Sequence, residues 1–304
     1  MIYPPALQSG DTIGIFSPSS AVEHGAIDRA LKMLEARGFQ TYVHEQTYAR
    51  EHQSAGTTSQ KVDAFHDLCA DPQIKAICAA RGGNRAGYML PHLDYAQIKK
   101  TPKPIIGYSD TTPLLNVIAQ RCGFVTYHGP LMMGLSEGVQ DERYLDAALQ
   151  TINGDITDID MNGSRSMQNG QATGHLVGGN LSLLISLMGT PYQPDFDGAL
   201  LFLEDVGDEI SRYDRMILQL SNAGIFDKIN GLILGDFSNT KDTGRQKFGY
   251  TIHDLFKAVT QERDYPVVTH APFGHGDQLI TFPIGAQSNL QVDDNRIKLS
   301  LIKH

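Results

Sequence analysis

The first half of the chain alternates short β-branched runs with segments of helical periodicity. The apolar run Thr12–Phe16 has the length and composition of a buried strand. Ile27, Leu31 and Leu34 follow at spacings i, i+4 and i+7, which is typical of a helix. Gly38 then supplies a signal for the end of that helix. The pattern predicts a strand and a helix in succession.

The same alternation continues to about residue 120. The further elements that it predicts are strands at 41–43, 74–79 and 104–107, a helix marked by Val62, Phe65 and Cys69 that ends at Asp71-Pro72, and a helix over 111–120. Strands that alternate with helices indicate a parallel sheet with both faces covered, because each crossover lays a helix across the sheet.

The alternation stops between Thr151 and Gln171, where the chain is rich in Asn, Asp, Ser and Gly and contains three Asn-Gly pairs. Such residues favour turns and show no sustained apolar period. We therefore expect a linker at 151–171 between an N-terminal domain, 1–150, and a C-terminal domain, 172–304. The second domain is predicted as a mixed β/α unit with a turn at Gly178-Gly179-Asn180, helices at 181–188 and around Ile210, Tyr213, Ile217 and Leu220, and strands at 199–203, 232–234, 267–270 and 296–301.

Composition and charge narrow the classes of function. The 304 residues are 41% hydrophobic and 19% charged, as in an ordinary globular chain long enough for two domains. The net charge of −9 disfavours a surface that neutralises nucleic-acid phosphates. The sequence shows no export signal and no apolar run of the roughly 18 residues that a membrane span needs. We expect a soluble, cytoplasmic protein with no nucleic-acid or membrane partner.

Cofactor and metal motifs are missing from the sequence. The three cysteines have no Cys-x-x-Cys spacing and are expected to be buried free thiols. The sequence contains no His-Glu-x-x-His, no Gly-x-Gly-x-x-Gly and no Gly-x-x-x-x-Gly-Lys-Ser/Thr. We therefore expect neither a metal ion nor a nucleotide cofactor.

The strongest candidate for chemistry is Ser109. The apolar strand Pro104–Gly107 stops at Gly-Tyr-Ser-Asp, and a helix begins again near Thr111. A strand, a sharp turn and a helix hold a nucleophilic hydroxyl at the carboxyl end of a parallel sheet. The alternative is that Ser109 or Thr111 only caps the helix, which the segment by itself favours. The second glycine of the usual Gly-x-Ser-x-Gly elbow is absent.

A glycine turn, Arg81-Gly82-Gly83-Asn84, follows the preceding strand and is expected at the same sheet edge as Ser109. Its backbone N–H groups can form half of an oxyanion hole, and the N–H of Asp110 the other half. A plain loop turn is the alternative.

Two segments of the second half can supply an acid and a base. Glu204 and Asp205 end an apolar strand, and an acid there can orient an imidazole, although acidic residues also end strands as ordinary turn residues. His275 lies between glycines and can act as a general base, whereas a lone loop histidine is usually solvated. His128 and His270 rank next, with structural roles considered first.

Taken together, these segments resemble the LD-carboxypeptidases, a family that includes the microcin-resistance serine hydrolases. The residues that carry the resemblance are Gly10–Ile15, Ser17–Ser20, Arg81-Gly82-Gly83, Leu93-Asp94-Tyr95, Gly107-Tyr108-Ser109-Asp110, His128-Gly129-Pro130, Gly178–Leu181, Leu203-Glu204-Asp205, Arg215-Met216, Gly235-Asp236-Phe237, Phe273-Gly274-His275 and Pro283–Ala286.

The resemblance implies a serine peptidase with a triad of Ser109, Glu204 and His275 at a cleft between two domains. It further implies an oxyanion hole formed by the N–H groups of Gly83 and Asp110. The implied fold is α/β, with an N-terminal parallel-sheet Rossmann-like (flavodoxin-like) domain and a C-terminal mixed β/α domain. The implied reaction removes the terminal D-alanine from murein tetrapeptides in cytoplasmic peptidoglycan recycling. Family members are cofactor-free and often homodimeric.

The chain departs from the family where Arg-Gly-Gly commonly continues with Tyr-Gly, since it reads Asn84-Arg85-Ala86 here. Arg81, Asn84 and Arg85 are candidates for contacts with the substrate, and an arginine can pair with a carboxylate through two hydrogen bonds. Two alternatives remain. One is a microcin-type hydrolase of amides or nucleotide-peptides, and the other is a two-domain protein that binds a small ligand without turning it over.

Overall fold

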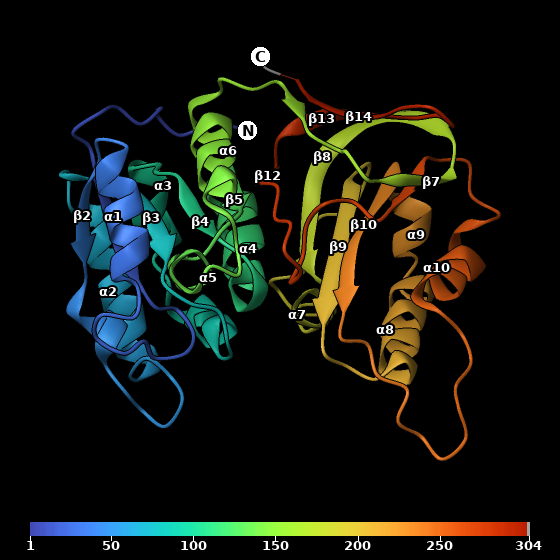
Figure 1. Ribbon diagram of the computed structural model, residues 1–304, viewed down its shortest axis with the longest axis horizontal. Helices are drawn as coiled ribbons and strands as arrows, with labels where there is room; N and C mark the ends of the chain where they lie inside the picture. Colours follow the sequence, from blue (N-terminus) through green and yellow to red (C-terminus); the bar gives the residue numbers. More distant parts are fainter. Residues whose placement is uncertain (303–304) are drawn as a thin grey trace. The chain divides into compact units, whose positions relative to one another are not determined.

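The computed structural model describes residues 1–302 of the chain, which divide into two compact units (Figure 1). The first unit contains residues 1–156 and 281–285. The second contains residues 157–280 and the chain from Ala286 onward. The chain therefore leaves the second unit for five residues, an excursion that the sequence pattern does not predict.

The first unit is built on a six-stranded sheet. Its strands are β1 (Thr12–Phe16), β2 (Gln40–Val43), β3 (Ile74–Ala79), β4 (Ile105–Gly107), β5 (Thr126–His128) and β12 (Phe282–Ile284). Its helices are α1 (Asp28–Ala36), α2 (Thr58–Ala70), α3 (Tyr95–Lys100), α4 (Thr112–Cys122), α5 (Met132–Glu137) and α6 (Glu142–Asn153), with short 3-10 turns at Glu45–Tyr48, Ala86–His92 and Ser109–Thr111.

The strand order of this sheet is β12-β5-β4-β3-β1-β2. Strands β1 to β5 pair in parallel, and β12 pairs with β5 in the antiparallel direction. The order 2-1-3-4-5 is that of the flavodoxin-like doubly wound fold. The expected α/β fold with a parallel N-terminal sheet is confirmed. Loops after adjacent strands β1, β3 and β4 consequently lie along one edge of the sheet.

The second unit is built on an eight-stranded sheet. Its strands are β6 (Asp158–Ile159), β7 (Arg165–Gln168), β8 (Gly170–Asn180), β9 (Leu200–Val206), β10 (Gly231–Ser238), β11 (Val267–Thr269), β13 (Gln287–Val292) and β14 (Ile297–Leu301). Its helices are α7 (Leu181–Ile185), α8 (Ile210–Asn222), α9 (Ile225–Lys228) and α10 (Ile252–Thr260).

The strand order of the second sheet is β6-β14-β13-β8-β9-β10-β11-β7. The four central strands from β8 to β11 are parallel, while β13, β14, β6 and β7 pair in the antiparallel direction. This arrangement confirms a mixed β/α unit. The range 151–171, expected as a linker, contains the end of α6, β6, β7 and the first residues of β8. Its Asn-Gly pairs fall at the end of α6 and in the turns around these short strands.

Strand β8 replaces the turn expected at Gly178-Gly179-Asn180. These residues pair with β9, with Gly178 opposite Phe202 and Asn180 opposite Glu204. A Cβ on Gly178 would lie 1.9 Å from the carbonyl oxygen of Phe202, and its φ is +148°. Glycine is therefore needed here for a close approach of two strands rather than for a reversal of the chain.

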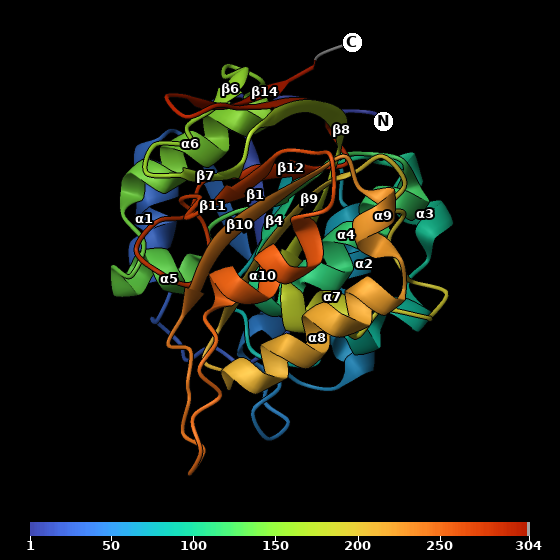
Figure 2. The ribbon, with the colours of Figure 1, turned by 90° about the vertical axis from the view of Figure 1, so that its right-hand side faces the viewer.

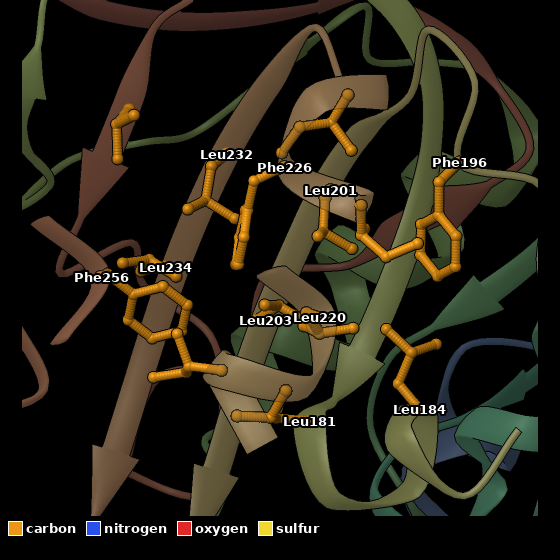
Figure 3. Packing of buried hydrophobic residues seen from close by; sticks show 14 of the residues in the cluster. Leu181, Leu184, Phe196, Leu201, Leu203, Leu220, Phe226, Leu232, Leu234 and Phe256 are labelled. Carbon is orange, nitrogen blue, oxygen red and sulfur yellow. The ribbon is translucent and has the colours of Figure 1, made fainter. Parts of the chain in front are cut away.

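Helices α8 and α10 cover one face of the central strands of the second sheet (Figure 2). The side chains in this layer form the main apolar core of the unit. Figure 3 shows Leu201 and Leu203 of β9 and Leu232 and Leu234 of β10 beside side chains from the helices, including Phe256. Tyr213 and Leu220, which the helical period placed on one face of α8, are fully buried. Periodicity in the sequence thus identified the buried face.

No helix within residues 1–302 combines the length and the apolar character that crossing a lipid bilayer requires.

Candidate active site

Ser109 lies in a strained turn at the carboxyl end of β4. Tyr108 is extended, and Ser109 has a φ of +61°, which is uncommon for a residue with a side chain. Gly107 permits the turn, because a Cβ there would lie 2.9 Å from Oγ1 of Thr111. A strained serine between a parallel strand and a helix is the geometry of a nucleophile elbow.

Thr111, one of the two residues considered as a cap for α4, does not cap it through its side chain. The N-cap residue of α4 is Thr111, and its side chain makes no capping hydrogen bond. The Thr111 hydroxyl instead donates to the carbonyl of Tyr108 at 2.9 Å. The hydroxyl of Thr111 therefore stabilises the turn that presents Ser109.

The Gly82-Gly83 turn packs directly against Ser109. A Cβ on Gly82 would lie 3.2 Å from both Cβ and Oγ of Ser109. Gly83 has a φ of +131°, and a Cβ there would lie 2.0 Å from Oγ of Ser20. The N–H of Ser20 donates to the carbonyl of Gly82 at 3.3 Å. The sequence expectation that this turn lies at the same sheet edge as Ser109 is confirmed.

The side chain of Asp110 joins the loops around this turn. Its Oδ2 accepts hydrogen bonds from Oγ of Ser19 at 2.6 Å and from the N–H of Ala86 at 2.8 Å. Asp110 as a whole is 2% exposed. Burial raises the pKa of Asp110, and the hydrogen bonds from Ser19 and Ala86 and the charge of Lys61 oppose that rise.

Glu204 and His275 form a buried pair in the second unit. Oε2 of Glu204 lies 2.6 Å from Nδ1 of His275, and the carboxylate of Glu204 is fully buried whereas the imidazole is 17% exposed. Glu204 is the fifth of the seven residues of strand β9, and His275 lies in the loop after β11. A short contact between a carboxylate and an imidazole fixes the orientation and the tautomer of the ring.

The pKa of His275 lies above its ordinary value of 6.5. Burial alone lowers this pKa, but the carboxylate of Glu204 raises it through its charge and its hydrogen bond, and the charges of Asp205 and Asp236 add to the rise. The net shift makes the imidazole a stronger base than a free histidine.

Asp205, the neighbour of Glu204, has a different partner. Alternate residues of a strand point to opposite faces. Oδ2 of Asp205 accepts from both the N–H and the hydroxyl of Ser182, at 2.7 and 2.6 Å. The two carboxylates at the end of β9 are therefore separated into one that binds the imidazole and one that anchors the start of α7.

The candidate substrate-binding residues lie in the loop after β3, and all three are exposed. The guanidinium of Arg81 donates to the carbonyl of Ala21 at 3.3 Å. The guanidinium of Arg85 stacks over the ring of Tyr88, 4.4 Å from its centre. Asn84 lies between them in the turn.

The two histidines ranked lower have structural surroundings. His128 is fully buried in β5 and packs edge-on against Tyr108. Nδ1 of His270 lies 3.1 Å from Oγ1 of Thr269. His270 also lines a cavity of about 450 Å³, together with residues of the second unit that include Asp236, Phe237, Phe273 and Asp277.

The cysteines are free and buried, as expected. Burial raises the pKa of Cys69 and of Cys78 to about 12 and that of Cys122 to about 11. Protonated thiols are poor nucleophiles, so these residues are not catalytic candidates. Residues 1–302 contain no group of three or more histidine, cysteine or acidic side chains placed to hold a metal ion.

Sequence reasoning missed Lys61, Ser19 and Asp236 as residues that support the site. Ser19 and Asp236 lie in segments that carried the family resemblance, but nothing there marked their side chains. Lys61 lies on α2 and is fully buried, although lysine is almost never buried without a partner. Its place beside the apolar residues of α2 gave no signal of this role.

Comparison with known proteins identifies the same family that the sequence motifs resemble. Residues 13–129 match the LD-carboxypeptidase N-terminal domain and residues 173–290 match the LD-carboxypeptidase C-terminal domain. A probable murein peptide carboxypeptidase of Bacillus subtilis is 33% identical over 290 residues, covering 94% of this chain and 90% of that protein.

Two further similarities are informative. The microcin C7 self-immunity protein of Escherichia coli is 26% identical over 327 residues, covering 97% of this chain and 94% of that protein. The crystal structure of a muramoyltetrapeptide carboxypeptidase from Oxalobacter formigenes superposes with a TM-score of 0.85 at 28% identity, covering 96% of this chain and 99% of that one. From its two matched domains and its relatives, the chain belongs to the LD-carboxypeptidase family.

Proposed function

We propose that this protein is a serine carboxypeptidase that releases the terminal D-alanine of murein tetrapeptides. The bond that it hydrolyses joins D-alanine to the L-centre of lysine or meso-diaminopimelate. Ser109 is the nucleophile, His275 the general base and Glu204 the acid that orients the base. The N–H groups of Gly83 and Asp110 bind the oxyanion.

In the first step, Oγ of Ser109 attacks the carbonyl carbon of the residue before D-alanine, and Nε2 of His275 takes the hydroxyl proton. The carbonyl oxygen becomes an oxyanion that accepts hydrogen bonds from Gly83 and Asp110. The C–N bond then breaks, and His275 gives its proton to the nitrogen of D-alanine, which leaves.

In the second step, water attacks the acyl ester on Ser109, and His275 takes one of its protons. Collapse of the tetrahedral intermediate returns that proton to Oγ of Ser109 and releases the shortened peptide as a carboxylic acid. Glu204 stabilises the imidazolium in both steps and keeps its negative charge. No cofactor enters this sequence.

The observation that carries the proposal is the buried Glu204–His275 pair, with its 2.6 Å contact and raised imidazole pKa. The strained Ser109 and the adjoining Gly82-Gly83 turn support it from the first unit. The names of the relatives from Bacillus subtilis and Oxalobacter formigenes support a murein peptide as the substrate. The proposal requires the two units to bring Ser109 within reach of His275.

The test is mass spectrometry of a murein tetrapeptide incubated with the protein. We expect loss of D-alanine with the natural chain and a loss of rate of about a thousandfold or more in Ser109→Ala, Glu204→Ala and His275→Ala. Ser59→Ala, Glu262→Gln and His92→Asn change exposed residues of the same types and should keep the natural rate. Full activity of Ser109→Ala would exclude this mechanism.

A second candidate reaction uses the same residues on a different substrate. The similarity to the Escherichia coli microcin C7 self-immunity protein favours an amide or nucleotide-peptide whose leaving group is not a D-amino acid. An aminoacyl-sulfamoyl adenosine is the matched probe. Its cleavage without D-alanine release identifies this reaction, while labelling of Ser109 by a fluorophosphonate reports the nucleophile in either case. If the protein shows neither turnover nor labelling, the result favours a ligand-binding protein.

Arg81, Asn84 and Arg85 are proposed to contact the substrate, since all three are exposed in the loop that contains the Gly82-Gly83 turn. An arginine paired with a substrate carboxylate acts on binding more than on chemistry. We expect Arg81→Met or Arg85→Met to raise KM with little change in kcat. An unchanged KM in both variants would remove the arginines from the substrate site.

The family resemblance also leads us to propose a cytoplasmic homodimer. Cell fractionation with an antibody against the chain tests the location. Light scattering on the purified protein tests the assembly, with a mass of two chains expected.

A further inference from the structure

Three loops meet at the carboxyl edge of the first sheet, next to Ser109. They follow the adjacent strands β1, β3 and β4 and comprise residues 17–20, 80–86 and 108–111. Only the last loop carries the nucleophile. The reaction proposed above needs the second loop at a fixed distance from the third, because Gly83 and Ser109 act on the same carbonyl group.

The Asp110 carboxylate connects all three loops through a single oxygen. Oδ2 accepts from Oγ of Ser19 in the first loop and from the N–H of Ala86 in the second. Ser19 is fully buried and Asp110 is 2% exposed. A buried carboxylate with two short donors makes charge-assisted hydrogen bonds, which are stronger than those between neutral groups.

Lys61 also binds the second loop. Its ammonium, on the fully buried side chain, donates to the carbonyl of Arg85 at 3.4 Å and to Oγ of Ser54 at 3.2 Å. The backbone of Ser54 bridges to Ser20 in the first loop. Lys61 thus contacts the second loop directly and is linked to the first loop through Ser54.

The charges of Lys61 and Asp110 favour each other. Burial lowers the pKa of Lys61 and raises that of Asp110, and in each case the charge of the other residue opposes the effect of burial. Removal of one of these charges takes away the compensation that the other receives inside the protein. Neither side chain has a part in the reaction steps proposed above.

The loop held in this way is the one that packs against the nucleophile. Gly82 leaves room for Ser109, and Gly83 fits against Ser20 only because it lacks a Cβ. Oxyanion donors act by being fixed before the reaction begins, and a displacement of about 1 Å can lower a rate roughly a hundredfold.

We propose that the Asp110 carboxylate and the Lys61 ammonium are positioning groups that set the distance between the Gly82-Gly83 turn and Ser109. This inference rests on the proposed role of Ser109 as nucleophile. It gives Asp110 two separate functions, one through its backbone N–H and one through its side chain.

The test uses Ser19→Ala and Lys61→Met, which remove partners of the network and leave the nucleophile and the oxyanion donors unchanged. We expect each to lower kcat for the tetrapeptide roughly ten- to a hundredfold with KM within about threefold. The rate of Ser109 labelling by a fluorophosphonate should fall in parallel. Hydrogen exchange of the amides at 82–86 should accelerate.

Lys103→Met is the matched control. Lys103 is also buried, and its ammonium donates to the carbonyls of Leu68 and Asp71, but it precedes β4 and so lies at the opposite edge of the sheet. Lys103→Met should lower Tm without changing kcat, the labelling rate or the exchange at 82–86 in the folded protein. Lys61→Arg, which keeps the charge, should recover part of the lost kcat.

The inference is overturned if Ser19→Ala and Lys61→Met keep the natural kcat, labelling rate and exchange at 82–86. It is also overturned if these variants, like Lys103→Met, lower only Tm and leave the properties of the folded protein unchanged. If the natural protein releases no D-alanine but Ser109 is still labelled, the proposed substrate is wrong. Slower labelling in the two variants then supports the positioning role, and an unchanged labelling rate overturns it. If Ser109 is not labelled either, faster hydrogen exchange confined to the amides at 82–86 in the two variants supports the positioning role, and unchanged exchange overturns it.

Discussion

Nδ1 of His275 lies 2.6 Å from Oε2 of a glutamate that no solvent reaches, Glu204. The other carboxylate oxygen of Glu204, Oε1, is buried without a hydrogen-bond partner within residues 1–302. The imidazole is therefore the main group that stabilises this charge, and the charge in turn fixes the imidazole. The charge of Glu204 and the orientation of the His275 ring therefore depend on each other.

Glu204→Gln tests this dependence with little change of shape. The amide can either donate to or accept from Nδ1, so it no longer enforces a single tautomer, and it cannot stabilise an imidazolium. We expect kcat to fall about 10²- to 10⁴-fold, and Tm to fall at pH values where the imidazole is protonated, because that charge loses its partner. Steady-state kinetics and thermal unfolding measure the two effects. A kcat within threefold of the natural value would contradict the role of Glu204.

The raised pKa of His275 predicts the pH dependence of the reaction. The general base must be neutral, so kcat/KM should rise with pH through an apparent pKa above 6.5. Asp236→Asn removes one of the three carboxylates that raise this pKa and should move the limb to lower pH. Asp264→Asn, at an exposed position, should leave it unchanged. A limb that does not move in Asp236→Asn would contradict the electrostatic assignment.

The same shift affects stability with a definite sign. Because the pKa of His275 is higher in the folded chain than in the unfolded chain, protonation favours folding. This contribution is fully present below about pH 6.5 and is lost as the pH rises through the folded-state pKa. Denaturant unfolding of His275→Asn and of the natural protein should show a difference in free energy that narrows over this range.

Gly82→Ala should lower activity with little loss of stability. The added methyl group would lie 3.2 Å from Cβ and Oγ of Ser109, so the turn or the serine must shift by a few tenths of an ångström. We expect a fall in kcat of roughly tenfold or more. Gly87→Ala adds a methyl group in open space of the same loop region and serves as the control. Equal kcat values for the two variants would argue against close packing at Ser109.

Gly178→Ala should mainly lower stability. A methyl group there would overlap the backbone of Phe202 in the middle of the second sheet, in addition to the strain of a positive φ. We expect a loss of about 2 to 4 kcal/mol in the free energy of unfolding. Gly249→Ala has the same sign of φ but no atom within 4 Å of the new group, so it measures the strain alone. A similar loss in both variants would contradict the clash with Phe202.

Most of the parallel elements followed from periodicity, because apolar runs such as Thr12–Phe16 are buried on both faces and carry a strong signal. Short polar strands gave no such signal. Arg165–Gln168 is only partly buried and the first residues of β8 are mostly exposed, and neither segment contains an apolar run. Their pairing with β11 and β13 is decided by residues about 100 positions away, which local patterns do not report.

For the candidate site, too, the sequence indicated some features and not others. The sequence singled out Ser109 at a turn between a strand and a helix, Glu204 at the end of an apolar run and His275 between two glycines, and the family resemblance suggested their roles. The contacts that fix them were not found, since Lys61, Ser19 and Asp236 act across loops that only the fold brings together. The buried Lys61 even contradicts the usual preference of lysine for the surface, and only its partners explain it.

The excursion of residues 281–285 into the first unit has a consequence for synthesis of the protein. Strand β12 covers the edge of β5, which otherwise ends the first sheet with unpaired backbone groups. A ribosome completes β5 at residue 128 but does not make the covering strand until residue 284 of 304. During that interval the nascent chain exposes a sheet edge of the kind that pairs with other chains. A protein truncated before Thr281 should therefore aggregate, even though almost all of its first unit has been made.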